Sequence, residues 1–275
     1  MSPKCLLTIA GTDPSGGAGI QADLQVFRDF GYHGLSAITA VVWQNTCGVG
    51  GFEAMSGEVL GEQLRALAED VAIEGVKLGM LPAVTTVEAV CAFLANCAHV
   101  PVVLDPVMAS GDGGHLLSAN EAVLSAAGLL HPFVAVLTPN VPEAERLLGR
   151  TIQTHDAMLE AAASLRQFGA KAVLLKGGHL VGQADFVLTD AWADADGARL
   201  LEALLPIEQD VRGTGCQLAS AILAGLVDGL APMEAALGAR RYLNDLLHRR
   251  RANIGRGRPV IVRSTAGGIL PEENE

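Results

Sequence analysis

A glycine-rich turn leading into an apolar helix is the most chemically suggestive stretch of the sequence. Gly213, Thr214, Gly215 and Cys216 come directly before an Ala/Leu/Ile-rich run with helical spacing. The first N–H groups of such a helix have no partner inside it and lie at the positive end of its dipole. The turn therefore predicts an anion site, suited to phosphate or to a phosphoryl group in transfer, and a lowered pKa for the Cys216 thiol. The alternative is a plain turn before a core helix, with the cysteine as a small buried hydrophobe.

Further polar side chains stand where predicted buried strands end. Gln44 closes a strand-like run that begins at His33, within the segment Trp43-Gln44-Asn45-Thr46. Ligands of open α/β sheets gather beyond such strand ends. A primary amide donates and accepts together, which matches a heterocycle with both functions on one edge. The alternative is a loop amide satisfied by backbone groups.

Two charged residues occupy similar positions. Asp105 ends the buried run 100–106, and Lys176 ends the run 170–178 beside paired glycines. The carboxylate suits a metal-bound water or a nucleotide, although aspartates also cap turns. The lysine indicates a nearby anion.

The segment Asn140-Val141-Pro142-Glu143 is predicted to start a helix. Asn140 is a good N-cap and Glu143 stands at N3, which makes an asparagine version of the capping box. The same side chains can hold water around Mg²⁺, which keeps much of its hydration shell.

The loop GTDPSGGAG (residues 11–19) lies between a predicted strand, 5–10, and a predicted helix, 20–30. Neither G-x-G-x-x-G nor the Walker A pattern is present, so the loop is expected to line a small-molecule pocket rather than to wrap a pyrophosphate. Asp23 lies one helical turn further on and can point back toward that pocket. Otherwise it is a solvated helix carboxylate.

The remaining pattern predicts one domain over residues 1–275, an α/β fold with a mostly parallel sheet between helical layers. Residues 184–191 and 199–205 are expected to be antiparallel edge strands joined by WADADGA, and 107–114 (VMASGDGG) a mobile flap. A long surface helix is expected over 233–251.

Composition narrows the class of protein. Half of the 275 residues are hydrophobic and only 4% are aromatic, which fits buried parallel strands covered by helices. The net charge of −11 argues against a general nucleic-acid or anionic-membrane binder. Five cysteines without regular spacing predict neither a disulfide framework nor a paired C-x-x-C metal site, and indicate a reducing cytoplasm. No apolar run has the length of a signal peptide or a membrane span.

Taken together, these motifs resemble the hydroxymethylpyrimidine/phosphomethylpyrimidine kinases of thiamine biosynthesis, in the ribokinase-like superfamily. The resemblance runs nearly end to end, through LTIAGTDPSGGAGIQADL, WQNTCGV, VKLGMLP, VVLDPVM, TPNVPEAE, VLLKGGH, RGTGCQLASAI and NIGRGRPV. It implies a ribokinase-like three-layer α/β/α fold with antiparallel edge strands. It also implies transfer of the γ-phosphoryl group of ATP, with Mg²⁺, to 4-amino-5-hydroxymethyl-2-methylpyrimidine and then to its monophosphate, by a homodimer.

The resemblance also assigns residues. The pyrimidine pocket would be formed by Gln44, Gly11, Asp23, Met80 and Val107. Positions Gly213 to Cys216 match the anion hole, with Cys216 where sugar-kinase relatives carry an aspartate base. Asn140 and Glu143 match a pair placed around metal and phosphates, with Asp105 expected to join through water, and Lys176 matches a phosphate-contacting lysine.

Three departures from the family pattern stand out. Val211-Arg212 replaces a threonine and a histidine. Arg212 adds a bidentate phosphate donor that we assign to ATP binding; the alternative is that it only faces solvent. The flap lacks a lysine, which bears on how the monophosphate is held. Trp43 replaces a smaller residue, and is expected to narrow the pocket or stack on the ring.

Other functions remain open at this point. A pyridoxal/pyridoxine kinase of the same superfamily is the nearest, because its substrate is also a six-membered nitrogen heterocycle with a hydroxymethyl arm. A non-catalytic pyrimidine sensor is another, although Lys176, Asn140 and Glu143 argue against it. Cys216 disfavours a ribokinase-type sugar kinase.

Overall fold

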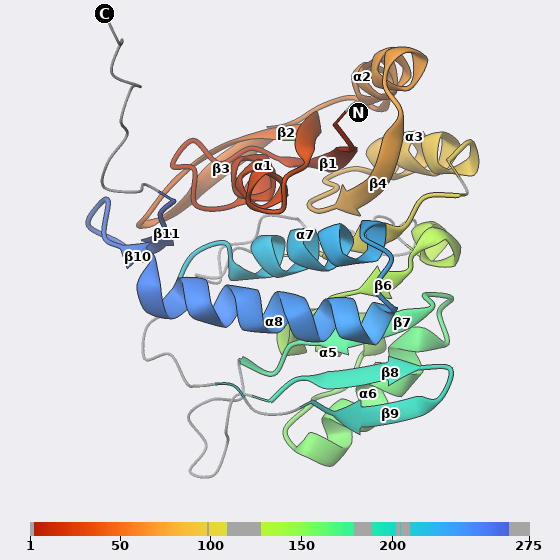
Figure 1. The fold of residues 1–275 in the computed structure, drawn as a ribbon, viewed down its shortest axis with the longest axis vertical. Coiled ribbons are helices and arrows are strands. Elements are labelled where there is room, and N and C mark those ends of the chain that lie inside the picture. Colours follow the sequence, from red (N-terminus) through yellow and green to blue (C-terminus); the bar gives the residue numbers. More distant parts are fainter. Residues whose placement is uncertain are drawn as a thin grey trace, which may run out of the picture.

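The computed structural model describes residues 3–97, 99–108, 128–178, 189–201, 204 and 210–263. Its centre is a nine-stranded sheet with the strand order β3-β2-β1-β4-β5-β6-β7-β8-β9 (Figure 1). The strands of this sheet are β1 (Cys5–Gly11), β2 (His33–Asn45), β3 (Gly48–Ala54), β4 (Ile73–Leu78), β5 (Val102–Leu104), β6 (Val136–Leu137), β7 (Ala172–Leu175), β8 (Ala191–Asp194) and β9 (Gly197–Leu200). The strands from β2 to β7 in this order are parallel, while β3, β8 and β9 pair antiparallel at the two edges.

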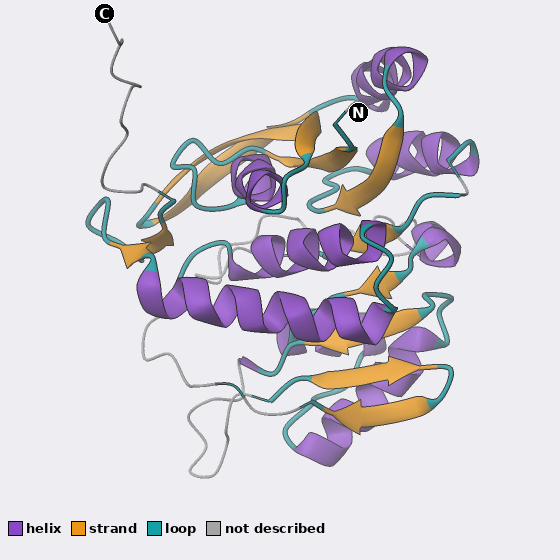
Figure 2. Ribbon diagram, viewed as in Figure 1, coloured by secondary structure: helices purple, strands orange, loops and turns teal. Residues whose placement is uncertain are grey.

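Helices cover both faces of the sheet (Figure 2). They are α1 (Gly19–Asp29), α2 (Gly57–Asp70), α3 (Val84–Ala95), the 3₁₀ helix η1 (Gly128–Phe133), α5 (Val141–Leu148), α6 (His155–Arg166), α7 (Thr214–Val227) and α8 (Pro232–Arg249). Helices α1, α7 and α8 pack on one face, and α2, α3, η1, α5 and α6 pack on the other. The mostly parallel three-layer α/β/α fold predicted from the sequence is therefore confirmed.

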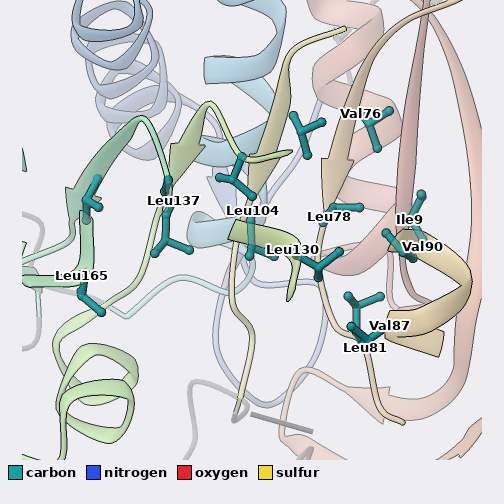
Figure 3. Packing of buried hydrophobic residues seen from close by; sticks show 14 of the residues in the cluster. Ile9, Val76, Leu78, Leu81, Val87, Val90, Leu104, Leu130, Leu137 and Leu165 are labelled. Carbon is teal, nitrogen blue, oxygen red and sulfur yellow. The ribbon is translucent and has the colours of Figure 1, made fainter. Parts of the chain in front are cut away.

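The strand pleat divides the apolar side chains between two cores. In β1, Leu7 and Ile9 enter the core beneath α2 and α3, whereas Leu6 enters the core beneath α1 and α7. Successive side chains of a strand point to opposite faces, so a strand covered on both sides must be apolar throughout. Figure 3 shows the first of these cores, where Ile9, Leu78, Leu104 and Leu137 from neighbouring strands meet.

The order of the strands also indicates where a ligand-binding crevice is expected. Strand β1 pairs with β2 on one side and with β4 on the other, both in parallel. The chain therefore leaves β1 in one direction and later returns on its other side, which is the topological switch point where ligands of open α/β sheets bind. The strand-end residues predicted to do chemistry all belong to this carboxyl edge.

Some details of the prediction were wrong. The antiparallel edge pair is β8 and β9, with Ala195 and Asp196 as its turn, rather than 184–191 and 199–205 joined by WADADGA. Trp192 is fully buried, and its indole donates to Asp194 at 2.6 Å, so WAD belongs to a core strand. Strand β3 and the two-stranded sheet of β10 (Arg251–Ala252) and β11 (Val260–Ile261) were not predicted. Residues 184–188 and most of the predicted flap, 109–114, lie outside the described residues.

Among the described helices, none combines the length and apolarity that a membrane span requires.

Candidate active site

Two glycine loops that are far apart in the sequence pack directly on each other. Gly213 is the N-cap of α7 with a left-handed backbone, φ 74°, and a Cβ there would overlap the carbonyl oxygen of Gly17. Only glycine fits such a position without strain. The backbone N–H of Gly19, at the start of α1, donates to the Cys216 sulfur. The loop 11–19 and the turn 213–216 therefore pack together.

The first turn of α7 faces the ends of the central strands. Its N-cap, Gly213, has no side chain to accept from the first N–H groups of the helix. A Cβ at Gly215 would lie 3.1 Å from the Lys176 ammonium and 3.3 Å from Asp105 Oδ2, so the helix end and this ion pair are in direct contact. Uncapped N–H groups beside a lysine form a site in which negative charge is stabilised.

Lys176 and Asp105 form a partly exposed ion pair beside the start of α7. Lys176 Nζ donates to Asp105 Oδ1 at 2.8 Å, and the side chains are 15% and 3% exposed. Asp105 Oδ1 also accepts a long hydrogen bond of 3.4 Å from Thr138. Burial opposes the charge of Lys176, but Asp105 and Glu143 outweigh it and raise its pKa. The lysine is therefore held charged at the helix end.

The capping box at α5 is present in full. Glu143 N–H donates to Asn140 Oδ1 at 2.9 Å, and Asn140 N–H donates to Glu143 Oε2 at 2.8 Å. The Glu143 carboxylate also accepts the backbone N–H of Met108, just beyond β5. Its burial raises its pKa to about 7, although Lys176 opposes the shift. Glu143 thus joins the start of α5 to the end of β5 beside the Asp105–Lys176 pair.

On the other side of the crevice, Gln44 is held at both ends of its amide. Gln44 Nε2 donates to the carbonyl of Thr12 at 3.0 Å, and Gln44 Oε1 accepts from Arg212 Nη2 at 2.6 Å. Arg212 Nη2 also lies 3.5 Å from Asp13 Oδ2. Gln44 is half-buried, whereas Asp13 and Arg212 are buried.

A small apolar cluster adjoins this amide. It consists of Ala40, Val42, Met80 and Met108, with Val107, Val49, Phe52 and Leu147 packed against it. A Cβ at Gly11 would lie 3.3 Å from Val42 and 3.4 Å from the Met80 sulfur. The structure thus brings together Gly11, Met80 and Val107, which were predicted to line the pyrimidine pocket. An apolar wall beside one fixed amide is a typical site for a small heterocycle.

Asp23 does not stand among these lining residues. It is fully buried, and Oδ2 accepts from Thr8 at 2.6 Å and from Lys77 Nζ at 2.8 Å, while Oδ1 accepts from Ser220 at 2.8 Å. The solvated carboxylate considered as an alternative is therefore wrong. Both oxygens already have partners, so Asp23 supports the site from below by joining α1, β1, β4 and α7.

Two further expectations need correction. Burial raises the pKa of the Cys216 thiol to about 11, and nearby Lys77 only partly opposes this, so the lowered pKa expected in the first helical turn is wrong. Trp43 is 52% exposed and follows Val42 in the strand, so it lies on the opposite face from the pocket cluster. Its ring packs over Gly50 and Gly51 of β3, so it does not narrow the pocket.

Arg212 lies apart from the other residues assigned to ATP. Its guanidinium contacts Gln44 and Asp13 on the pocket side, whereas Asn140 and Lys176 pair in an isolated β-bridge beyond the ends of β6 and β7. The structure thus divides the predicted set into two groups, with the start of α7 between them.

The sequence reading missed Lys77 and Asp13. Both are fully buried charges within motifs that were recognised, VKLGMLP and GTDPSGG. A charged residue between the apolar residues Val76 and Leu78 was the available signal for Lys77, because an unpaired charge is not tolerated in a buried run. Asp13 gave no such signal, since aspartates are frequent in turns.

The fold and this crevice define a ribokinase-like α/β kinase that acts on a small molecule. The uncapped helix end, lysine and carboxylates suit a phosphoryl group in transfer, and the amide with its apolar wall suits a heterocyclic acceptor.

Comparison with known proteins agrees with this class. The sequence pattern of the phosphomethylpyrimidine kinase family matches residues 13–261. The hydroxymethylpyrimidine/phosphomethylpyrimidine kinase of Rhizobium meliloti is 41% identical over 92% of this chain and 94% of its own length. The thiamine biosynthesis bifunctional protein ThiED of Geobacter sulfurreducens is 40% identical over 92% of this chain, which spans 50% of that protein. The chain belongs to the phosphomethylpyrimidine kinase family.

Solved structures share the fold. The phosphomethylpyrimidine kinase of Clostridium difficile aligns with a TM-score of 0.75 at 35% identity, over 88% of this chain and 98% of that one. The pyridoxal kinase of Bacillus subtilis, solved as an ADP complex, aligns with a TM-score of 0.83 at 29% identity, over 94% of this chain and 97% of that one.

Proposed function

We propose that this protein transfers the γ-phosphoryl group of ATP to the hydroxymethyl oxygen of 4-amino-5-hydroxymethyl-2-methylpyrimidine, and then phosphorylates the monophosphate to the diphosphate, in thiamine biosynthesis. The observation that carries the proposal is the contact between the start of α7 and the Lys176–Asp105 pair, next to the Gln44 pocket. It provides a phosphoryl site and a heterocycle site within one crevice of a chain that belongs to this kinase family.

The start of α7 would stabilise charge during transfer. Thr214, Gly215 and Cys216 present their N–H groups beyond the N-cap Gly213, and Lys176 adds a positive charge at the same place. A single well-placed donor of this kind typically lowers the barrier by about 2.7–4 kcal/mol. The close contact of Gly213 with Gly17 would hold those donors in position before substrate arrives.

The alcohol proton needs only a weak acceptor. Cys216 is a thiol at neutral pH, because its pKa is raised to about 11. Phosphoryl transfer passes through a loose transition state in which positioning and charge stabilisation dominate. Cys216 therefore contributes first through its backbone N–H.

The residues near Lys176 fit Mg²⁺ bound together with ATP phosphates. The carboxylates of Asp105 and Glu143 supply hard oxygen ligands, directly or through water, and Asn140 orients Glu143. When bound, the ion would neutralise developing charge on the phosphates. Lys176 would contact the transferring phosphate, and Asn140 would lie on the ATP side.

A second activity, phosphorylation of pyridoxine, has its own support in the 0.83 TM-score to a pyridoxal kinase. Both substrates carry a hydroxymethyl arm on a six-membered nitrogen ring. The apolar cluster around Met80 accepts either ring, so discrimination falls to the polar contacts of Gln44.

We further propose that residues 1–275 act as a single domain in a homodimer, and that the protein works in the reducing cytoplasm, where its five free cysteines remain thiols. Light scattering on the purified protein, with a mass twice that of the chain expected, tests the dimer.

The experiment that tests the function is ATP-to-ADP turnover with hydroxymethylpyrimidine, its monophosphate and pyridoxine in parallel. Phosphorus NMR of the products distinguishes monophosphate from diphosphate. Turnover of both pyrimidines is expected. Turnover of hydroxymethylpyrimidine alone would contradict the proposed phosphorylation of the monophosphate. Faster turnover of pyridoxine would make phosphorylation of pyridoxine the main activity. Binding of the pyrimidine without turnover would indicate a sensor.

A further inference from the structure

Arg212 is buried beside the pocket in an arrangement that leaves part of its side chain unsatisfied. The residue is 3% exposed, and its backbone N–H donates to Pro259 at 3.0 Å. Its Nη2 donates to Gln44 Oε1 at 2.6 Å and lies 3.5 Å from Asp13 Oδ2, while its buried Nε has no hydrogen-bond partner among the residues that the structure describes. Burying a guanidinium with an unpaired N–H is costly for stability, and such a group calls for a functional explanation.

The main contact of Arg212 determines how the Gln44 amide is oriented. A guanidinium only donates hydrogen bonds and a backbone carbonyl only accepts them. With Arg212 at Oε1 and the Thr12 carbonyl at Nε2, a rotated amide would place donor against donor and acceptor against acceptor. The amide therefore has a single polarity.

Once both contacts are made, the amide of Gln44 retains one N–H and one oxygen lone pair. These two functions complement a ring nitrogen next to an exocyclic amino group, which is the edge that a 4-aminopyrimidine presents. Pyridoxine has a methyl group and a ring hydrogen beside its nitrogen, so it offers no amino donor on that edge. A site built to hydrogen-bond one substrate rejects an analogue that lacks the bonding group.

We propose that Arg212 is a positioning residue that sets the polarity of the Gln44 carboxamide and thereby selects an aminopyrimidine over a pyridine-type ring. This role rests on the proposed function. Arg212 acts through Gln44 and does not itself contact the ring. The buried Asp13, whose Oδ1 accepts from the N–H and hydroxyl of Ser15, holds the guanidinium from its other side.

The first test is Arg212→Lys, which keeps a positive charge beside Asp13 but cannot reproduce the planar fork. At saturating ATP, KM for hydroxymethylpyrimidine should rise about tenfold or more, as expected for a lost hydrogen bond to a charged group. The kcat should change less than about threefold, because Arg212 acts on binding rather than on transfer. KM for pyridoxine should change less than about twofold, so that the preference for the pyrimidine falls.

A double-mutant cycle separates positioning from general structural support. If Arg212 acts through Gln44, Arg212→Lys in a Gln44→Met background should change KM for the pyrimidine by less than about twofold, whereas independent effects would multiply. Arg258→Lys is the matched control, because the Arg258 guanidinium pairs with Asp210 at 2.6 Å rather than with the Gln44 amide. It should leave KM for both substrates unchanged.

Equal rises for pyrimidine and pyridoxine, or equal effects in both backgrounds, would overturn the proposal. So would a rise confined to the monophosphate, which would mean that Arg212 contacts phosphate. If Arg212→Lys does not fold, Asp13→Asn/Arg212→Gln removes both charges together and carries the same expectations. A wild-type protein that fails to phosphorylate the pyrimidine would contradict the proposed function itself, which the wild-type assay shows before any variant is made.

Discussion

Two Asp–Lys pairs lie beneath the same crevice, each with a nitrogen–oxygen distance of 2.8 Å, but their surroundings differ. The pair of Asp23 and Lys77 is completely enclosed, and both oxygens of Asp23 also accept from neutral hydroxyls, those of Thr8 and Ser220. The pair of Asp105 and Lys176 is partly exposed and lies against Gly215 at the start of α7.

The difference shows how to distinguish an ion pair that stabilises the fold from one that can bind a ligand. The Asp23 carboxylate accepts three hydrogen bonds from within the protein and is fully buried, so it is not accessible to a ligand. Asp105 Oδ2 faces the helix end, and Lys176 there has hydrogen-bond capacity for an incoming phosphate. Saturation of the partners, rather than the type of residue or the length of the ion pair, distinguishes the two roles.

The largest expected effect is on the enclosed pair. Lys77→Met leaves the Asp23 carboxylate buried without its counter-charge, which should lower the free energy of unfolding by about 3–5 kcal/mol. Urea denaturation measures it. The double variant Asp23→Leu/Lys77→Met should recover most of the loss, because no unpaired charge remains. A Lys77→Met protein of unchanged stability but impaired turnover would break the comparison, since Lys77 would then be a working residue.

Disrupting the Asp105–Lys176 pair should affect turnover more than stability. Lys176→Met should reduce kcat about 10²–10³-fold, since it removes one charge donor from the proposed phosphoryl site, and it should lower thermal stability less than Lys77→Met does, because this pair is partly exposed. Steady-state kinetics and calorimetry measure the two quantities. Lys171→Met, at an exposed lysine just before β7, is the matched control and should leave both unchanged. A loss of stability as large as that of Lys77→Met would mean that the Asp105–Lys176 pair is also a structural ion pair.

Glu143, which lies beside the Asp105–Lys176 pair, should make the stability of the protein depend on pH. Burial raises the pKa of Glu143 from its ordinary 4.5 to about 7, so between these values the folded protein binds more protons than the unfolded one. The resulting contribution to stability is complete below pH 4.5 and is lost as the pH rises through 7. Without metal or nucleotide, Glu143→Gln should therefore gain thermal stability relative to wild type as the pH rises through this range.

Scanning calorimetry from acid to mildly alkaline pH measures the Glu143 effect. Glu88→Gln, at an exposed position in α3, is the control and should follow the wild type at every pH. A constant difference between Glu143→Gln and wild type would mean that Glu143 is ionised throughout, as a ligand of the Asp105–Lys176 pair rather than a buried acid.

The smallest expected effect concerns the thiol between the two pairs. Because the pKa of Cys216 is raised to about 11, iodoacetamide should modify it about a hundredfold more slowly near pH 8 than a thiol of ordinary pKa. Exposed Cys47 in the same protein serves as the reference, with peptide mass spectrometry as the readout. Faster modification of Cys216 than of Cys47 would show that Lys77 acts on the sulfur and is not purely structural.

The sequence by itself determined the order of elements, the parallel character of the sheet and most residues of the candidate site. These follow from local causes: apolar runs such as 5–10 must be buried strands, and Asn140 with Glu143 caps a helix wherever it occurs. The strand-end rule then placed Gln44, Asp105 and Lys176 at one edge. The family resemblance added Gly11, Met80 and Val107, which the structure brings together.

Only the tertiary structure decided which charges are saturated. Nothing in the sequence near Asp23 reveals Lys77, which is 54 positions away, and nothing near Arg212 reveals Gln44, which is 168 positions away. The pKa of Cys216 likewise depends on burial and on charges from other elements, which overrode the expectation from its place in a helix. Hydrogen-bond saturation and desolvation are properties of a packed environment, and the chain creates that environment only when distant segments meet.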